Sequence, residues 1–173
     1  MDKRNYLNDV KLELTSACNK DCSFCYLKTR KKRLDTPYTK NELFSIVDKL
    51  HKQNILNVRL SGGEPLMYEN LEELLGYLKK KQFRVGLVTN GELITDRFLK
   101  DSRGRIDYLC VSFHQLKNRK IIDRLERHDV AYSLNTILSA SNVRLLDKFH
   151  KFVAGLSRAR SWNLLRELLF AGI

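Results

Sequence analysis

Three cysteines lie close together near the beginning of the chain, and their spacing is C-x3-C-x2-C: Cys18, Cys22 and Cys25. Thiolates are soft ligands that suit zinc or an iron–sulfur cluster. A structural zinc site is usually closed by four ligands, but the histidine nearest to this loop in sequence is His51. The fourth cysteine, Cys110, lies in an apolar segment, which favours a buried thiol over a ligand. Three ligands leave one metal position open, as a catalytic site requires. Zinc with a distant fourth ligand, or three incidental thiols, remains the alternative.

Two further motifs follow strand-like segments. The first is Ser61-Gly62-Gly63-Glu64-Pro65. Its glycines let the backbone approach a ligand closely, and its carboxylate, together with an exposed carbonyl, can orient an ammonium group. An ordinary strand-to-helix turn is the alternative. The second motif is Thr89-Asn90-Gly91, which a type I′-like Asn-Gly turn explains equally well.

Alternating strand and helix patterns position these motifs. Strands are predicted for Val10 to Thr15, Ile55 to Leu60, Phe83 to Val88, Tyr108 to Phe113 and Val130 to Leu138. Helices are predicted after the capping residues Thr39 (with Glu42 in a capping box), Asn70, Thr95 and Ser141, and around Ile121 to Leu125. The stretch from Arg158 to Leu169 fits either a sixth strand or a terminal helix.

This order favours βαβ units and a parallel sheet. The 173 residues suit one α/β domain, an open, partial (β/α)5-6 TIM-like barrel, since a closed eight-unit barrel typically takes about 250 residues. Residues 1–173 are therefore expected to form a single core domain, with a cysteine loop at 16–34 and a last unit at 157–173 that is truncated. Sites in such sheets form at the carboxyl ends of the strands. Each motif follows a strand, so we expect one site at one rim.

The cysteine loop after the first strand, an aromatic residue before the third cysteine and the Gly-Gly-Glu-Pro segment together resemble the signature of the radical S-adenosylmethionine (radical SAM) superfamily. The resemblance implies that Cys18, Cys22 and Cys25 hold a [4Fe–4S] cluster and that the methionine part of SAM chelates the fourth iron. It further implies that SAM is contacted by Phe24 at the adenine, by the loop of Gly62, Gly63, Glu64 and Pro65 at the methionyl amine, and by Asn90, Ser112 and Asn135. For Asn135 a purely structural role is equally open. Phe113-His114 departs from the Asp-Gly that many relatives carry there.

The resemblance implies an enzyme that reductively cleaves SAM to a 5′-deoxyadenosyl radical, which abstracts hydrogen from a substrate. The similarity is greatest to members that modify peptides or proteins or build the molybdenum cofactor, so a peptide or protein is the expected substrate. A flavodoxin-like or ferredoxin-like protein is the expected external one-electron reductant. Two alternatives remain: an activating protein for a glycyl-radical enzyme, and a basic nucleic-acid-binding module with a structural zinc.

The chain is basic, with 32 Lys and Arg against 20 Asp and Glu and a formal net charge of +12. An ordinary solvated basic surface explains this charge, and the alternative, more specific interpretation is that the surface binds an acidic partner. The densest basic run is Lys28 with Arg30 to Arg33; it has no interleaved aromatic residues, which argues against nucleic acid. No apolar run approaches the roughly 18 residues of a membrane span, and no signal-like segment follows Met1. We therefore expect a cytoplasmic protein.

Overall fold

A six-stranded parallel sheet forms the centre of the computed structural model, which describes residues 8–29, 38–140 and 142–166. The strands lie in chain order: β1 (Asp9–Glu13), β2 (Asn57–Ser61), β3 (Arg84–Thr89), β4 (Tyr108–Ser112), β5 (Tyr132–Leu138) and β6 (Ala159–Arg166). Every neighbouring pair is parallel. The sheet is open, because β1 and β6 form its two edges. The predicted partial barrel of parallel strands is confirmed.

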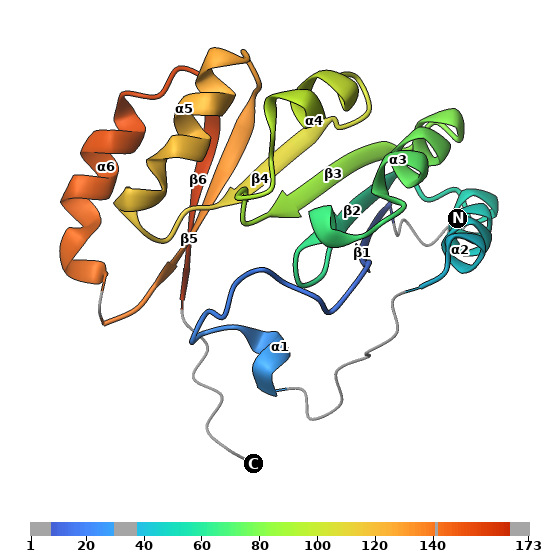
Figure 1. Ribbon diagram of the computed structural model, residues 1–173, viewed down its shortest axis with the longest axis horizontal. Coiled ribbons are helices and arrows are strands. Elements are labelled where there is room, and N and C mark those ends of the chain that lie inside the picture. Colours follow the sequence, from blue (N-terminus) through green and yellow to red (C-terminus); the bar gives the residue numbers. More distant parts are fainter. Residues whose placement is uncertain (1–7, 30–37, 141, 167–173) are drawn as a thin grey trace, which may run out of the picture.

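Helices connect the strands and cover one face of the sheet, as Figure 1 shows for α3 to α6. They are α1 (Tyr26–Thr29), α2 (Lys40–Lys52), α3 (Leu71–Lys80), α4 (Asp96–Asp101), α5 (Arg119–Arg127) and α6 (Leu146–Ala154), with 3-10 turns η1 (Pro65–Met67), η2 (Leu116–Asn118) and η3 (Val143–Leu145). The short α1 lies apart from the others, after the loop that leaves the carboxyl end of β1 (Figure 1).

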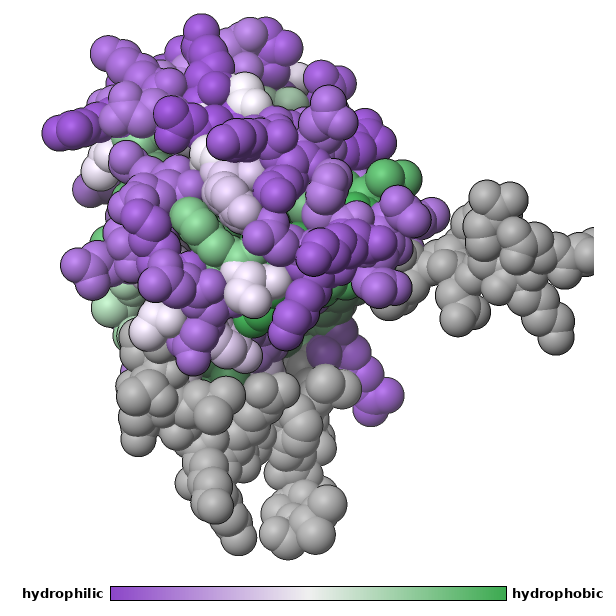
Figure 2. All heavy atoms as spheres, turned by 90° about the vertical axis from the view of Figure 1, so that its right-hand side faces the viewer, coloured by the Kyte–Doolittle hydropathy of each residue, from purple (hydrophilic) through white to green (hydrophobic). Residues whose placement is uncertain are grey.

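Alternation along the strands separates a buried face from an uncovered one. The buried side chains pack with the helices in one apolar core; on the strands they include Leu12, Val58, Leu60, Val85, Leu87, Leu109, Val111 and Leu134. The other side of the sheet, called here the open face, carries polar residues that include Lys11, Glu13, Arg59, Ser112 and Asn135. The side seen in Figure 2, which is the right-hand side of Figure 1, is mostly hydrophilic, with hydrophobic side chains in small scattered groups.

The predicted helix caps have mixed outcomes. Thr39 caps α2 in a complete capping box with Glu42, and Thr95 caps α4 by accepting a hydrogen bond from the Phe98 amide at 3.0 Å. Asn70 occupies the N-cap position of α3, as predicted, but its side chain makes no capping hydrogen bond. An amide side chain is not needed at this end, because acidic residues already occupy the first turn of α3. Ser141 lies outside the described residues.

The ambiguous stretch after Arg158 forms the strand β6 and not a helix. Its residues pair with β5 from Ala159 to Arg166, with a register irregularity between Tyr132 and Ser133. Residues 30–34 of the expected cysteine loop, most of the basic run, and residues 167–173 of the expected last unit lie outside the described residues. Among the helices that are described, none has the length and apolar character needed to span a membrane.

Candidate functional site

The Gly-Gly-Glu-Pro segment is joined to the cysteine loop by backbone hydrogen bonds. The Gly63 amide donates to the Thr15 carbonyl at 2.7 Å, and the Glu64 amide donates to the Ala17 carbonyl at 2.8 Å. A Cβ on Gly63 would lie 2.2 Å from the Ala17 oxygen. At Gly62, where φ is +137°, a Cβ would lie 2.4 Å from the Thr15 oxygen. The glycines therefore allow two protein loops to approach each other, whereas the sequence suggested close approach to a ligand.

Glu64 connects this segment to the end of β3. Its side chain is fully buried. One carboxylate oxygen accepts hydrogen bonds from the Thr89 hydroxyl at 2.6 Å and the Leu66 amide at 3.1 Å, and the other accepts from the Asn90 amide at 2.8 Å. Burial raises the pKa of this carboxyl, and the three donors oppose that shift. The carboxylate thus holds the loops after β2 and β3 together, a role that the sequence did not predict.

Replacing Glu64 with Gln is expected to destabilise the fold by about 2 kcal/mol, because an amide NH2 would face a donor where the carboxylate oxygen now accepts. Urea unfolding of the two chains measures the difference. Glu69→Gln, at an exposed position five residues after Glu64, is the matched control and should change stability by less than about 0.5 kcal/mol. Equal unfolding free energies for Glu64→Gln and the unchanged chain would show that the Glu64 carboxylate does not hold the loops after β2 and β3 together.

The turn after β3 contacts the cysteine loop through its side chains. Asn90 Nδ2 donates to Asn19 Oδ1 at 2.7 Å and lies 3.9 Å from Cys18 Sγ, and the Lys20 amide donates to the same sulfur at 3.4 Å. Glu92 accepts a hydrogen bond from Asn19 Nδ2 at 3.2 Å and pairs with Lys20 Nζ at 2.5 Å. The turn therefore holds the first part of the cysteine loop against the end of β3.

None of the three candidate ligands, all of which lie within the described residues, forms a disulfide. Cys18 is exposed, and Cys22 and Cys25 are half-buried, with the Cys25 amide donating to the Cys22 carbonyl at 3.1 Å. Across the residues that the structure describes, no group of three or more His, Cys, Asp or Glu side chains is close enough to hold one metal ion. A three-thiol donor set nevertheless fits a [4Fe–4S] cluster, since each thiolate then binds a different iron. Burial raises the pKa of Cys110 to about 11, so this thiol stays protonated and is a poor ligand.

Phe24 packs edge-on against His114, with ring centroids 4.9 Å apart and an interplanar angle of 79°. His114 lies just after β4, and its Nδ1 accepts a hydrogen bond from the Ile137 amide at 3.1 Å. Burial, with a smaller contribution from Lys20, lowers the pKa of His114 to about 4. The ring is therefore neutral at pH 7 with its proton on Nε2. Sequence reasoning assigned His114 no role, although its departure from the usual Asp-Gly was the available signal.

Ser112 and Asn135 are neighbours across β4 and β5 on the open face, and both are half-buried. Asn135 Oδ1 accepts a hydrogen bond from Asn163 Nδ2 on β6 at 2.9 Å. Asn163 was not singled out in the sequence, because the pairing of β6 with β5 was undecided there. The structure thus brings Ser112 and Asn135, two of the residues expected to contact SAM, together on neighbouring strands and adds the Asn163 amide beside Asn135.

Cationic side chains lie on the same open face at the middle of β1 and β2. Arg59 Nε pairs with Asp9 at 3.0 Å, yet the Arg59 side chain remains 51% exposed. Lys11 Nζ pairs with Glu13 at 3.1 Å and also donates to the Tyr26 hydroxyl at 3.4 Å. A half-exposed guanidinium retains donors for a second anion.

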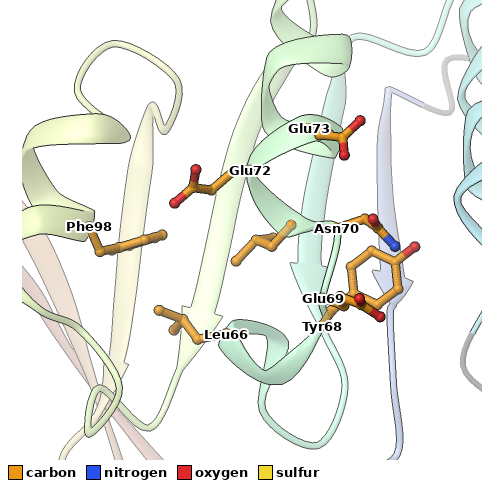
Figure 3. A pocket seen from close by; sticks show the side chains of 8 residues that line it. Leu66, Tyr68, Glu69, Asn70, Glu72, Glu73 and Phe98 are labelled. Atoms are coloured by element: carbon orange, nitrogen blue, oxygen red, sulfur yellow. The ribbon is translucent and has the colours of Figure 1, made fainter.

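The surface also has a pocket of about 310 Å³ between η1, α3 and α4 (Figure 3). Its lining includes Leu66, Tyr68, Glu69 and Phe98. Glu72 and Glu73 reach it from the first turn of α3. This pocket lies on the helical side of the sheet, and none of the expected site residues lines it. The pocket is therefore separate from the loops at the carboxyl ends of β1, β2 and β3, which carry the cysteines, the Gly-Gly-Glu-Pro segment and Asn90.

Comparison with known proteins gives three results. The family model described as "Radical SAM superfamily" matches residues 12–155. An S-adenosylmethionine-dependent nucleotide dehydratase from Lacinutrix mariniflava is 25% identical over 94% of this chain and 39% of the relative. A GTP 3′,8-cyclase from Aquifex aeolicus is 33% identical over 68% of this chain and 39% of the relative. The chain thus spans about two-fifths of the length of these curated relatives.

Solved structures give the same fold. Streptococcus suis SuiB bound to S-adenosylmethionine superposes with a TM-score of 0.80 at 14% identity, covering 95% of this chain and 42% of SuiB. Native anSMEcpe with bound AdoMet superposes with a TM-score of 0.79 at 16% identity, covering 92% of this chain and 51% of that one. At these identities the likeness concerns the fold alone.

Proposed function

The chain belongs to the radical SAM superfamily, whose enzymes use a [4Fe–4S] cluster and SAM, and we propose that Cys18, Cys22 and Cys25 hold that cluster. The observation that carries this proposal is the joining of three strand-end loops into one rim. The Gly-Gly-Glu-Pro segment is bonded to the backbone of the cysteine loop, and Glu64 and Asn90 extend the contacts to the end of β3. Cys18, Cys22 and Cys25 supply three thiols as the donor set. The fourth cysteine, Cys110, does not compete with them, because its raised pKa keeps its thiol protonated.

When bound, the cluster and SAM supply a 5′-deoxyadenosyl radical that takes a hydrogen atom from the substrate. The residues of this chain position these groups and limit access of water. Phe24 packs edge-on against the neutral His114 just after β4, so its ring lies at the carboxyl ends of the strands, which supports a contact of Phe24 with the adenine. Exclusion of water matters here, because a closed site prevents side reactions of reactive intermediates.

The remaining contacts to SAM are proposed for residues of the rim and the open face. The backbone of Gly62 and Gly63, with Glu64 and Pro65, would orient the methionyl amine. Glu64 would do so chiefly by fixing the loop, since its carboxylate already accepts three hydrogen bonds. Ser112 and Asn135 would contact the ribose or carboxylate, supported by their adjacent, half-buried positions.

We propose a nucleotide as the substrate. The relatives that match by sequence carry the names nucleotide dehydratase and GTP 3′,8-cyclase. The net charge of +12 and the half-exposed Arg59 on the open face support an anionic substrate. The electron would come from an external one-electron reductant of the flavodoxin or ferredoxin type.

A peptide or protein is the second candidate substrate, and it is the one expected from the sequence. SuiB bound to the precursor peptide SuiA shares the fold, with a TM-score of 0.78 at 15% identity. Activation of a glycyl-radical enzyme is a special case of this candidate. A nucleic-acid-binding module with a structural zinc receives no support from the family assignment.

The test is anaerobic reconstitution with iron and sulfide, followed by dithionite reduction and measurement of 5′-deoxyadenosine formed from SAM. The assay is run alone, with each nucleoside triphosphate, and with peptide mixtures. We expect a brown protein whose deoxyadenosine formation increases with one nucleoside triphosphate. An increase only with peptide would favour the second candidate. A colourless protein that forms no deoxyadenosine under any of these conditions would refute the function.

A further inference from the structure

We propose that Asn90 is a positioning residue that donates a hydrogen bond to the sulfur of Cys18 and thereby raises the reduction potential of the cluster. This inference rests on the proposed function, because it requires Cys18 to be a cluster ligand. It differs from the expectation drawn from the sequence, in which Asn90 contacts SAM.

The amide of Asn90 has one defined orientation. Its Oδ1 accepts a hydrogen bond from the Glu92 amide at 3.0 Å, so its NH2 group must face the other way. On that side Nδ2 donates to Asn19 Oδ1 at 2.7 Å and lies 3.9 Å from Cys18 Sγ. The contact with sulfur is thus a consequence of a fixed amide and not of a free side chain.

The backbone on both sides of this contact is also held in place. The Asn90 amide donates to the buried Glu64 carboxylate at 2.8 Å. On the cysteine loop, Asn19 and Lys20 both bind Glu92. The backbone amide of Lys20 itself donates to Cys18 Sγ at 3.4 Å. The sulfur of Cys18 therefore receives N–H donors from two residues, Lys20 and Asn90.

Hydrogen-bond donors to a ligating sulfur stabilise negative charge on an iron–sulfur cluster. Reduction adds negative charge that spreads onto the ligating sulfurs, and hydrogen bonds to sulfur are among the factors that set the potential of iron–sulfur clusters. An N–H donor is stronger toward the more negative state. The donor from Asn90 should therefore stabilise the reduced cluster and make it easier to reduce.

The informative variant is Asn90→Asp, which keeps the oxygen that accepts from Glu92 and replaces the NH2 group with a second oxygen facing Cys18. Asn90→Ala removes the donor without adding charge. Asn57→Asp is the matched control, because it makes the same charge change at the opposite, amino end of β2. The midpoint potential of each reconstituted chain is measured by a redox titration followed by electron paramagnetic resonance.

We expect a more negative midpoint potential for Asn90→Ala, a larger negative shift for Asn90→Asp, and a potential close to that of the unchanged chain for Asn57→Asp. Loaded Asn90 variants with an unaltered potential would overturn the inference while leaving the proposed function intact. Loss of the cluster in both Asn90 variants, with retention in Asn57→Asp, would also overturn it, since Asn90 would then have only a structural role. An unchanged chain that binds no cluster would refute the proposed function itself and the inference with it.

Discussion

Replacement of Cys18, Cys22 or Cys25 with alanine is expected to abolish the [4Fe–4S] cluster and, with it, all formation of 5′-deoxyadenosine from SAM. Under the proposed assignment each of the three thiols would bind a different iron of the cluster, so none would be redundant. Cys110 is a poor substitute, since burial raises its pKa to about 11 and it lies within β4 rather than on a strand-end loop. Iron and sulfide content, together with the visible absorbance of the anaerobic protein, measure the loss.

Cys110→Ser is the matched control for these three variants, because it removes one thiol outside the rim. It should retain the iron, the sulfide and the SAM cleavage activity of the unchanged chain. A cluster that persists at full occupancy in any one of the three alanine variants would show that the corresponding thiol is not a ligand.

Gly63→Ala should have the largest effect on the fold, with a destabilisation of at least about 3 kcal/mol or a displaced cysteine loop. The new Cβ would lie 2.2 Å from the Ala17 carbonyl oxygen and 2.6 Å from that of Ser16. Both contacts are with backbone, which cannot swing away as a flexible side chain can. Denaturant unfolding and cluster content after reconstitution are the measurements.

Gly76→Ala is the control for the same chemical change within α3, because a Cβ there meets nothing within 4 Å. It should stabilise the chain by roughly 0.5–1 kcal/mol, since alanine favours a helix interior over glycine. If Gly63→Ala unfolded at the same denaturant concentration as the unchanged chain and bound a full cluster, the tight joining of the two loops would be wrong.

Much of the fold follows from local patterns in the sequence. The alternation of Val10, Leu12 and Leu14, and the helical spacing of Leu71, Leu74, Leu75 and Leu78, each specify a buried face without reference to the rest of the chain. The sixth strand did not follow from such a pattern. Leu164 and Leu165 are both exposed, so β6 shows no alternation between a buried and a solvent face. Only its pairing with β5 identifies it as a strand.

The sequence predicted the motifs of the candidate site, but it did not predict the hydrogen bonds and ion pairs that join them. Spacing places the cysteines on one loop, and strand order places the Gly-Gly-Glu-Pro segment and Asn90 at the same edge. The contact of Asn19 with Glu92 spans 73 residues, and that of Glu64 with Thr89 spans 25. Such contacts depend on the exact register and rotamers of separate elements, which periodicity does not specify. For the same reason the sequence suggested that the glycines approach a ligand, whereas the structure places them against the backbone of Thr15 and Ala17.

The backbone bonds between residues 14–17 and 61–64 have a consequence for how the cofactor would be acquired. The amides of Gly63 and Glu64 find their acceptors within the chain as soon as β1 and β2 pair. The conformational entropy of the loop next to Cys18 is thus lost during folding rather than during metallation. Less of the free energy of ligation would then be needed to order the segment that leads into Cys18, and more of it would go into affinity.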